Sequence, residues 1–290
     1  MSCCGLFFMK LLYLITFIPA LLFADDALVP MQIGNFALSA TMQPGAFISL
    51  GDNIGQGDTL LYVFADDNVG KNSYSIDVFP SLIYGIRNDL SISFNTPFTP
   101  QKKEWKNHSS GLEDWYVEVE YAFFTKNRPK AQDQATILFD VILPTGSSTK
   151  NPPTGFGSPS FFLGATYYHT EVKWIYFTSY GALFTTTKHR TRFGNQLFYE
   201  FGIGRNIPSP AGWIFAWLVE FNGQYSWKNR MNGLTDPDSG GNVITLTPSM
   251  WFSSERIILQ FGVGLPVVQH LFGHQPKMYI SYDLAFGLLF

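Results

Sequence analysis

The chain ends with MYISYDLAFGLLF, residues 278–290. Apolar side chains stand at every second position from Met278 to Phe290. The positions between them carry mostly small or polar side chains. Alternation with a period of two is the pattern of a β-strand that buries one face in apolar surroundings. The stretch therefore predicts that the chain ends in such a strand.

The same alternation recurs upstream of the last strand. No part of the chain from Thr59 onward shows the periodicity of an amphipathic helix, so the sequence predicts an all-β protein. Twelve segments alternate in this way, namely 59–65, 73–84, 89–96, 114–124, 134–143, 160–168, 172–186, 194–205, 213–227, 243–252, 256–266 and 277–290.

The connections between these segments mostly alternate in length. Residues 86–88 and 253–255 form short connections, whereas residues 96–113 and 144–159 form long ones. Short periplasmic turns that alternate with longer extracellular loops are typical of outer-membrane barrels. We therefore predict a transmembrane antiparallel β-barrel of about 12 strands, with 10 or 14 as the alternatives.

The two faces of the segments indicate which side meets lipid. In 213–227 the aromatic residues Trp213, Phe215 and Trp217 share one face, and Glu220 and Asn222 lie on the other. The polar face carries few Lys or Arg residues, although a water-exposed surface is normally rich in them. An apolar face toward lipid and a polar face toward a lumen fit this pattern better than a soluble barrel does.

The N-terminus predicts export. Residues 11–23 are apolar, Lys10 precedes them and Ala24 follows them. Thirteen residues are too few to cross a bilayer as a helix, but they suit a secretory signal peptide. We expect a signal peptide at 1–24, an N-terminal leader or plug at 25–58 and the barrel at 59–290. Cys3 and Cys4 both lie in the signal peptide, so the mature chain is expected to contain no cysteine.

The composition excludes other classes of protein. Hydrophobic residues make up 46% of the 290 positions and charged residues 14%, which argues against disorder. The formal net charge is −3, so a strongly basic nucleic-acid-binding protein is excluded.

The C-terminus predicts the route into the membrane. Phe290 follows Leu288, Phe286, Leu284 and Tyr282 at alternate positions. This pattern resembles the signal that the barrel-assembly machinery of Gram-negative bacteria reads. We expect that machinery and outer-membrane lipids as partners, and the bacterial outer membrane as the location.

Short Gly/Pro-rich stretches resemble one family of outer-membrane proteins. They are PSLIYGIRNDLS (80–91), GLED (111–114), LPTG (143–146), GFGS (155–158), LTPS (246–249) and GVGLP (262–266). Together they resemble the "MetA pathway of phenol degradation" or transporter family over about residues 75–290. The resemblance implies a barrel that passes small, often aromatic or hydrophobic, molecules. Glu113 departs from the family pattern, which has a small residue at that position.

The candidate solute path consists of charged residues at positions expected to face inward. A plausible strand register sets Glu118 opposite Asp140, and a turn centred on residue 210 sets Glu200 opposite Glu220. Like charges in direct opposition are unfavourable, so they suggest a constriction that prefers cations. The alternative is a solvated polar lumen without selectivity. The full set of candidates is Asp77, Glu118, Glu120, Asp140, Glu200, Glu220, Asp283 and Arg256.

The function predicted from these observations is a passive channel for small solutes. A non-conducting structural or adhesive surface barrel is the alternative. A lipid-active enzyme needs a His beside a Ser on an outward strand position, and the histidines are expected in turns and loops. We therefore expect no enzyme, no catalytic residue and no cofactor. His270 and His274 would need a helix to bind a metal together, and Gly273 disfavours one, so we expect no metal.

Overall fold

The computed structural model describes residues 54–290, in which twelve strands form the wall of a closed antiparallel barrel. Each wall strand corresponds to one of the twelve segments expected from the sequence. Among the described residues, no helix is long and apolar enough to span a bilayer. The wall strands are β1 (Thr59–Gly70), β2 (Ser73–Arg87), β3 (Leu90–Asn95), β6 (Tyr116–Arg128), β7 (Ala131–Ile142), β8 (Ser160–Glu171), β9 (Trp174–Thr185), β10 (Gln196–Ile207), β11 (Trp213–Ser226), β14 (Gly241–Ser254), β15 (Ile257–Leu271) and β16 (Met278–Leu289).

The first and last strands close the barrel. Strand β1 pairs with β2 on one side and with β16 on the other. Thr59 and Phe290 exchange backbone hydrogen bonds of 3.3 and 2.8 Å at the seam. Closure pairs each wall strand on both sides over at least part of its length, as lipid surroundings require.

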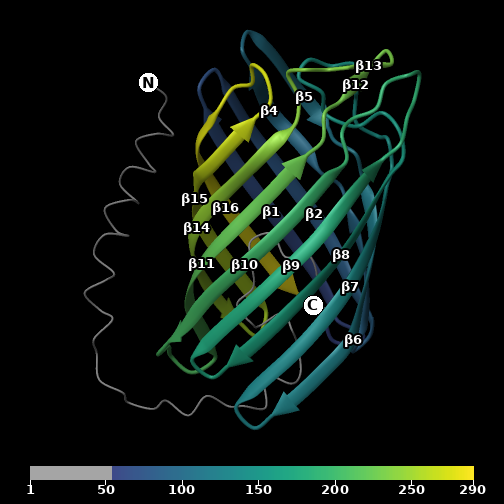
Figure 1. Cartoon of the computed structure of the whole chain (residues 1–290). Helices are drawn as coiled ribbons and strands as arrows, with labels where there is room; N and C mark the ends of the chain where they lie inside the picture. Colours follow the sequence, from purple (N-terminus) through teal and green to yellow (C-terminus); the bar gives the residue numbers. More distant parts are fainter. Residues whose placement is uncertain (1–53) are drawn as a thin grey trace. The chain divides into compact units, whose positions relative to one another are not determined.

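The barrel has one end with short turns and one end with long loops (Figure 1). We take the turn end, where Phe290 lies, as periplasmic and the loop end as extracellular. Two small hairpins extend the loop end, formed by β4 (Phe98–Glu104) with β5 (Asn107–Leu112) and by β12 (Arg230–Met231) with β13 (Leu234–Thr235). The first of these hairpins lies within residues 96–113, which were expected to form a loop.

The hairpin β4–β5 continues the wall beyond a break. Strand β2 pairs with β3 along its second half and with β4 along its first half. The break falls at Thr96 and Pro97, and Pro80 lies opposite it and accepts a backbone hydrogen bond from Thr96 at 3.0 Å. Proline has no backbone N–H to donate within a sheet. Because the neighbouring strand is interrupted opposite Pro80, no acceptor there is left without a donor.

The wall strands alternate as the sequence predicted. Outward side chains such as Leu284, Phe201 and Phe139 are exposed by 57%, 53% and 45%, which is the arrangement that a lipid-facing surface requires. The residues of the expected assembly signal on β16 follow this alternation, and Ala285 and Gly287 between them are buried. Recognition of that signal by the assembly machinery stays a prediction.

An apolar cluster fills the periplasmic half of the interior. Its members come from inward positions of six wall strands and from Ile54, which precedes β1 and is 1% exposed. Because these side chains pack on one another across the interior, the lumen is narrow at this level. The cluster consists of Ile54, Leu60, Tyr168, Ile175, Phe177, Ala216, Leu218, Trp251 and Ile258.

The segment before β1 folds back against the wall. Gly57 donates a backbone hydrogen bond to Gly85 at 2.8 Å, and Gly85 donates one to Asp58 at 3.0 Å. A Cβ atom on residue 85 would lie 2.0 Å from the carbonyl oxygen of Gly55, so this approach requires glycine. Residues 54–58 of the expected leader therefore turn inward, while the expected signal peptide and residues 25–53 lie outside the described residues.

Candidate functional site

Three aspartates form a row across the extracellular half of the lumen wall. Asp66 of β1 lies directly opposite Asp77 of β2 and directly opposite Asp283 of β16. Asp77 and Asp283 were expected to face inward, and their register with Asp66 places them there. Asp66 was not predicted, because the first alternating segment was taken to end at residue 65. Its parity with Leu60, Tyr62 and Phe64 was the available signal.

A fourth carboxylate joins this row from the wall break. The hydroxyl of Thr99 lies 2.5 Å from Asp77 Oδ1 and also contacts Glu113 Oε1. A single hydroxyl has one proton to donate, so it cannot donate to both carboxyl groups at once. Glu113, which departs from the family pattern described above, therefore lies beside Asp77 at the lumen wall.

The predicted pair on β6 and β7 is confirmed. Glu118 lies directly opposite Asp140, and Asp140 is 8% exposed. Glu120, the next inward position on β6, is 2% exposed. The hydroxyl of Ser93 on β3 lies 3.5 Å from Glu118 Oε1. A second acidic patch therefore lies beside the aspartate row, on neighbouring strands.

The expected pair on β10 and β11 is wrong by two residues. Glu200 lies opposite Asn222, and Glu220 lies opposite Gly202. The two glutamates face the lumen as diagonal neighbours, close enough for their charges to interact. Ser249 donates a hydrogen bond of 2.7 Å to Glu220 Oε1.

The basic candidate does not belong to the lumen wall. Arg256 lies in the exposed turn between β14 and β15, so its expected inward strand position is wrong. Lys102 of β4 lies opposite Ser75, an inward position near the loop end, and it interacts electrostatically with Glu113. At least one basic side chain, that of Lys102, therefore lies between the inward acids and the extracellular end of the barrel.

Several buried acceptor atoms in the lumen lack a hydrogen-bond partner. They are Asp66 Oδ1, Asp140 Oδ1 and Glu200 Oε2. Ionised carboxylates only accept hydrogen bonds, and a buried acceptor without a donor is costly. The lumen therefore favours occupants that carry positive charge or N–H and O–H donors.

The long loop 143–159 is fixed to the barrel by Asp114. Its carboxylate accepts backbone hydrogen bonds from Gly146 at 2.8 Å and from Phe156 at 2.6 Å. Thr145 accepts one from the backbone of Trp115 at 2.8 Å. Burial raises the pKa of the Asp114 carboxyl, and the two N–H donors oppose that shift. The GLED, LPTG and GFGS stretches therefore meet at one point, which their spacing in the sequence did not reveal.

Two glycines make this junction possible. A Cβ atom on residue 155 would lie 2.3 Å from Asp114 Oδ1, and one on residue 146 would lie 2.5 Å from the carbonyl oxygen of Thr154. Real Cβ atoms do not approach so closely, so both positions need glycine for close contact.

The same loop reaches toward the opposite wall. Pro152 is buried and lines a cavity of about 260 Å³ together with residues of β1, β2, β4 and the connection between β15 and β16. Strands β7 and β8, which carry the loop, are separated from β1 by β6, β3 and β2 on one side, and from β15 by β9, β10, β11 and β14 on the other. Loop 143–159 therefore narrows the extracellular mouth. Other residues that line the cavity are Asn68, Tyr74, Lys102, Glu104 and Gln275.

Comparison with known proteins supports the fold. No protein-family model and no curated protein matches the chain, so membership of the phenol-degradation transporter family stays a prediction. An outer membrane channel from Pseudomonas putida F1 is 16% identical, with a TM-score of 0.63 over 86% of this chain and 99% of its own.

Two further solved structures are similar over less of this chain. The NanC porin is 13% identical, with a TM-score of 0.47 over 79% of this chain and 98% of its own. LpxR from Salmonella typhimurium is 8% identical, with a TM-score of 0.49 over 79% of this chain and 99% of its own. The Pseudomonas channel shows the fold, and together with the apolar outward face it identifies the chain as a twelve-stranded β-barrel of the bacterial outer membrane.

Proposed function

We propose that the chain is an outer-membrane channel for the passive passage of small solutes and that it prefers cations. The observation that carries the proposal is the row of Asp77, Asp66 and Asp283, which lie side by side on three neighbouring strands. Like charges in direct opposition destabilise a sheet, so a cation or donor-rich solute that passes between them relieves a cost built into the wall.

The interior supports a narrow path. The apolar cluster occupies the periplasmic half, and loop 143–159 narrows the extracellular mouth. A twelve-stranded barrel lies between eight-stranded barrels, which side chains fill, and sixteen-stranded porins with open water channels. Small solutes with aromatic or other apolar surface fit such a path better than large hydrated ones, as the resemblance to the phenol-degradation transporters also implies.

We also propose that the chain is not an enzyme, and this proposal rests on the surroundings of His169. His169 lies within β8 and faces outward. The expectation that the histidines lie in turns and loops is wrong for this residue, and also for His108 in β5 and His270 in β15. Its Nδ1 lies 2.5 Å from Asp133 and its Nε2 3.2 Å from Glu171. Each ring nitrogen therefore lies beside a carboxylate, and neither is free to act as a general base toward a substrate.

The position of loop 143–159 favours a channel over an adhesive barrel. Pro152, Thr154 and Ser158 of this loop are buried, and Asp114 fixes the loop to the wall. A loop that packs inward presents little surface to another cell.

Planar-bilayer recording of the refolded mature chain tests the proposal. We expect small, steady single-channel openings. A barrel that is shown to be folded by heat-modifiable mobility, yet does not conduct with or without residues 25–58, would contradict it.

A further inference from the structure

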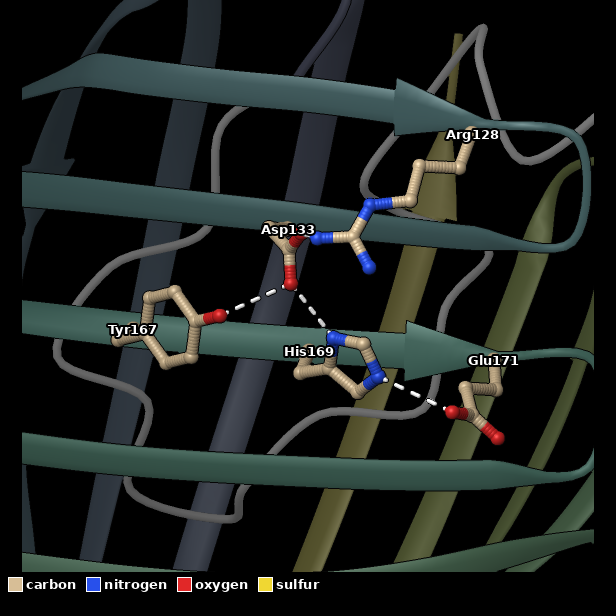
Figure 2. Close-up of polar contacts among 5 residues, drawn as sticks. All are labelled: Arg128, Asp133, Tyr167, His169 and Glu171. Atoms are coloured by element: carbon tan, nitrogen blue, oxygen red, sulfur yellow. Dashed lines mark hydrogen bonds and ion pairs between the residues drawn. The ribbon is translucent and has the colours of Figure 1, made fainter.

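A network of charged side chains lies on the outside of the barrel at its periplasmic end (Figure 2). Asp133 of β7 accepts hydrogen bonds from Tyr167 Oη at 2.8 Å and from His169 Nδ1 at 2.5 Å, and it also pairs with Arg128 of β6. His169 then reaches Glu171 at 3.2 Å.

The register places this network on the lipid-facing side. Asp133 lies opposite His169 on β8. The residue between Tyr167 and His169 is Tyr168, which belongs to the apolar cluster inside the barrel. Neighbouring residues of a strand point to opposite faces, so Tyr167 and His169 point outward. All of these residues lie at the ends of β6 and β8 or the start of β7, where the wall meets the periplasmic surface of the membrane.

This side of the rim has an excess of positive charge. Asp133 is buried by its three donors, whereas the Arg128 side chain is 47% exposed and uses one of its five N–H groups in the contact with Asp133. Five basic residues lie along the periplasmic ends of β6 to β10, against the two acids Asp133 and Glu171, and His169 adds a further charge when both its nitrogens are protonated. The five are Lys126, Arg128, Lys130, Lys173 and Arg205.

The remaining rim is different. Arg87 is paired with Asp89 at 2.9 Å, and Arg256 has Glu255 as its neighbour in the same turn. Positive charge is therefore concentrated on one side of the periplasmic rim, which leaves Arg87 as a natural control.

Aromatic side chains extend the patch at the same level. The rings of Trp174 and Tyr176 stack with centroids 6.5 Å apart, and the Arg205 guanidinium lies 5.4 Å from the Trp174 ring centroid. Trp and Tyr belts mark the interface between lipid headgroups and acyl chains. The patch therefore sits where phosphate groups of the periplasmic leaflet lie.

We propose that the periplasmic rim of β6 to β10 is a binding site for the headgroup of an anionic phospholipid. The exposed N–H groups of Arg128 take the phosphate, and Lys126, on the same face opposite Asp133, adds charge. The acyl chains lie along the outward side chains of β7 and β8, which include Ile137, Phe139 and Leu163, each exposed by 41% to 47%. Asp133 is a positioning residue that holds the guanidinium beside the imidazole.

Native mass spectrometry of the folded barrel with matched phosphatidylglycerol and phosphatidylethanolamine tests the proposal. The wild type should retain phosphatidylglycerol preferentially. A basic residue near an anionic lipid surface contributes enough for roughly a fivefold change in retention, so Lys126→Gln/Arg128→Gln should lower phosphatidylglycerol retention by at least about tenfold. Arg87→Gln should leave retention unchanged.

Two results would overturn the proposal. One is equal retention of the two lipids by the wild type, and the other is undiminished retention of phosphatidylglycerol by the double variant. Asp133→Asn should lower retention without the loss of any basic residue. If the double variant does not form a heat-modifiable barrel, the salt dependence of wild-type retention decides instead. Preference for phosphatidylglycerol that does not fall as salt rises contradicts a phosphate site.

Discussion

Glu118 lies directly opposite Asp140 across the pair formed by β6 and β7, and both carboxyl groups face the lumen. Neutral residues at positions 118 and 140 would leave the apolar outward face of β6 and β7 unchanged. The barrel instead places acids at this point, in the aspartate row and on β10 and β11. The proposed cation path would account for the acids at all three positions.

We predict that neutral replacement of this pair stabilises the barrel. Glu118→Gln/Asp140→Asn removes two acidic groups that face each other in the wall, which should raise the free energy of unfolding by about 1 kcal/mol. Urea unfolding in lipid vesicles measures it. Glu255→Gln, in the exposed turn between β14 and β15, serves as the control and should be neutral. A destabilised double variant would show that the pair is held by a bound cation or a shared proton even without solute.

Asp114→Asn should loosen loop 143–159. The amide keeps one acceptor oxygen, but its NH₂ group faces an N–H donor where the second oxygen stood, so one of the two backbone bonds is lost. The loss of a hydrogen bond to a charged acceptor raises the population of the open loop. Trypsin cleavage after Lys150 should therefore become about tenfold faster. Asp238→Asn is the matched control, because Asp238 accepts a backbone bond from His274 in another loop. Equal cleavage of wild type and Asp114→Asn would show that the junction does not hold the loop.

Gly155→Ala should cost about 2 kcal/mol or more of stability, because the new methyl group overlaps the Asp114 carboxylate. Gly212 provides a contrast, since it has a φ of 81° and no atom within 4 Å of its Cβ position. Gly212→Ala is therefore strained by its backbone alone and should cost about 1–2 kcal/mol. Thermal unfolding followed by gel mobility measures both, and only Gly155→Ala should also speed cleavage at Lys150. If Gly155→Ala had the stability and the cleavage rate of the wild type, residue 155 would not lie against the Asp114 carboxylate.

Ile54→Ala should raise the single-channel conductance. Ile54 is buried in the apolar cluster of the periplasmic half, so truncation of its side chain widens the path at this cluster and costs about 2–4 kcal/mol of packing energy. Ile137→Ala is the control, because Ile137 faces lipid and is 41% exposed. Conductance that is unchanged in both variants would mean that solutes do not pass this cluster.

The barrel itself could be predicted because lipid imposes a strict pattern on the sequence. Each wall strand alternates between apolar and other side chains, so all twelve were found. Glu118 and Asp140 were paired correctly because inward positions must pair with inward positions, and a bulge between Ala122 and Phe124 shifts the register that the turn sets by one residue. The wider turn between β10 and β11 allowed more than one register, and Glu200 was placed two residues away from its true partner.

The extracellular end could not be predicted in the same way. No lipid contacts β4 and β5 beyond the membrane, so nothing forces their side chains to alternate, and the hairpin was taken for a loop. Asp66 was lost for a related reason, because the apolar residues that marked its strand stop just before it. The junction between Asp114, Gly146 and Phe156 joins residues about thirty to forty positions apart, a contact that no local pattern encodes.

The most direct test of the channel is its reversal potential in a potassium chloride gradient across a planar bilayer. The account predicts a potential of the sign that marks cation preference in the wild type. It also predicts a shift toward zero in Glu118→Gln/Asp140→Asn, and no shift in Glu255→Gln. A wild-type potential at zero or of the opposite sign, or a double variant that matches the wild type, would contradict the assignment of the lumen acids to a cation path.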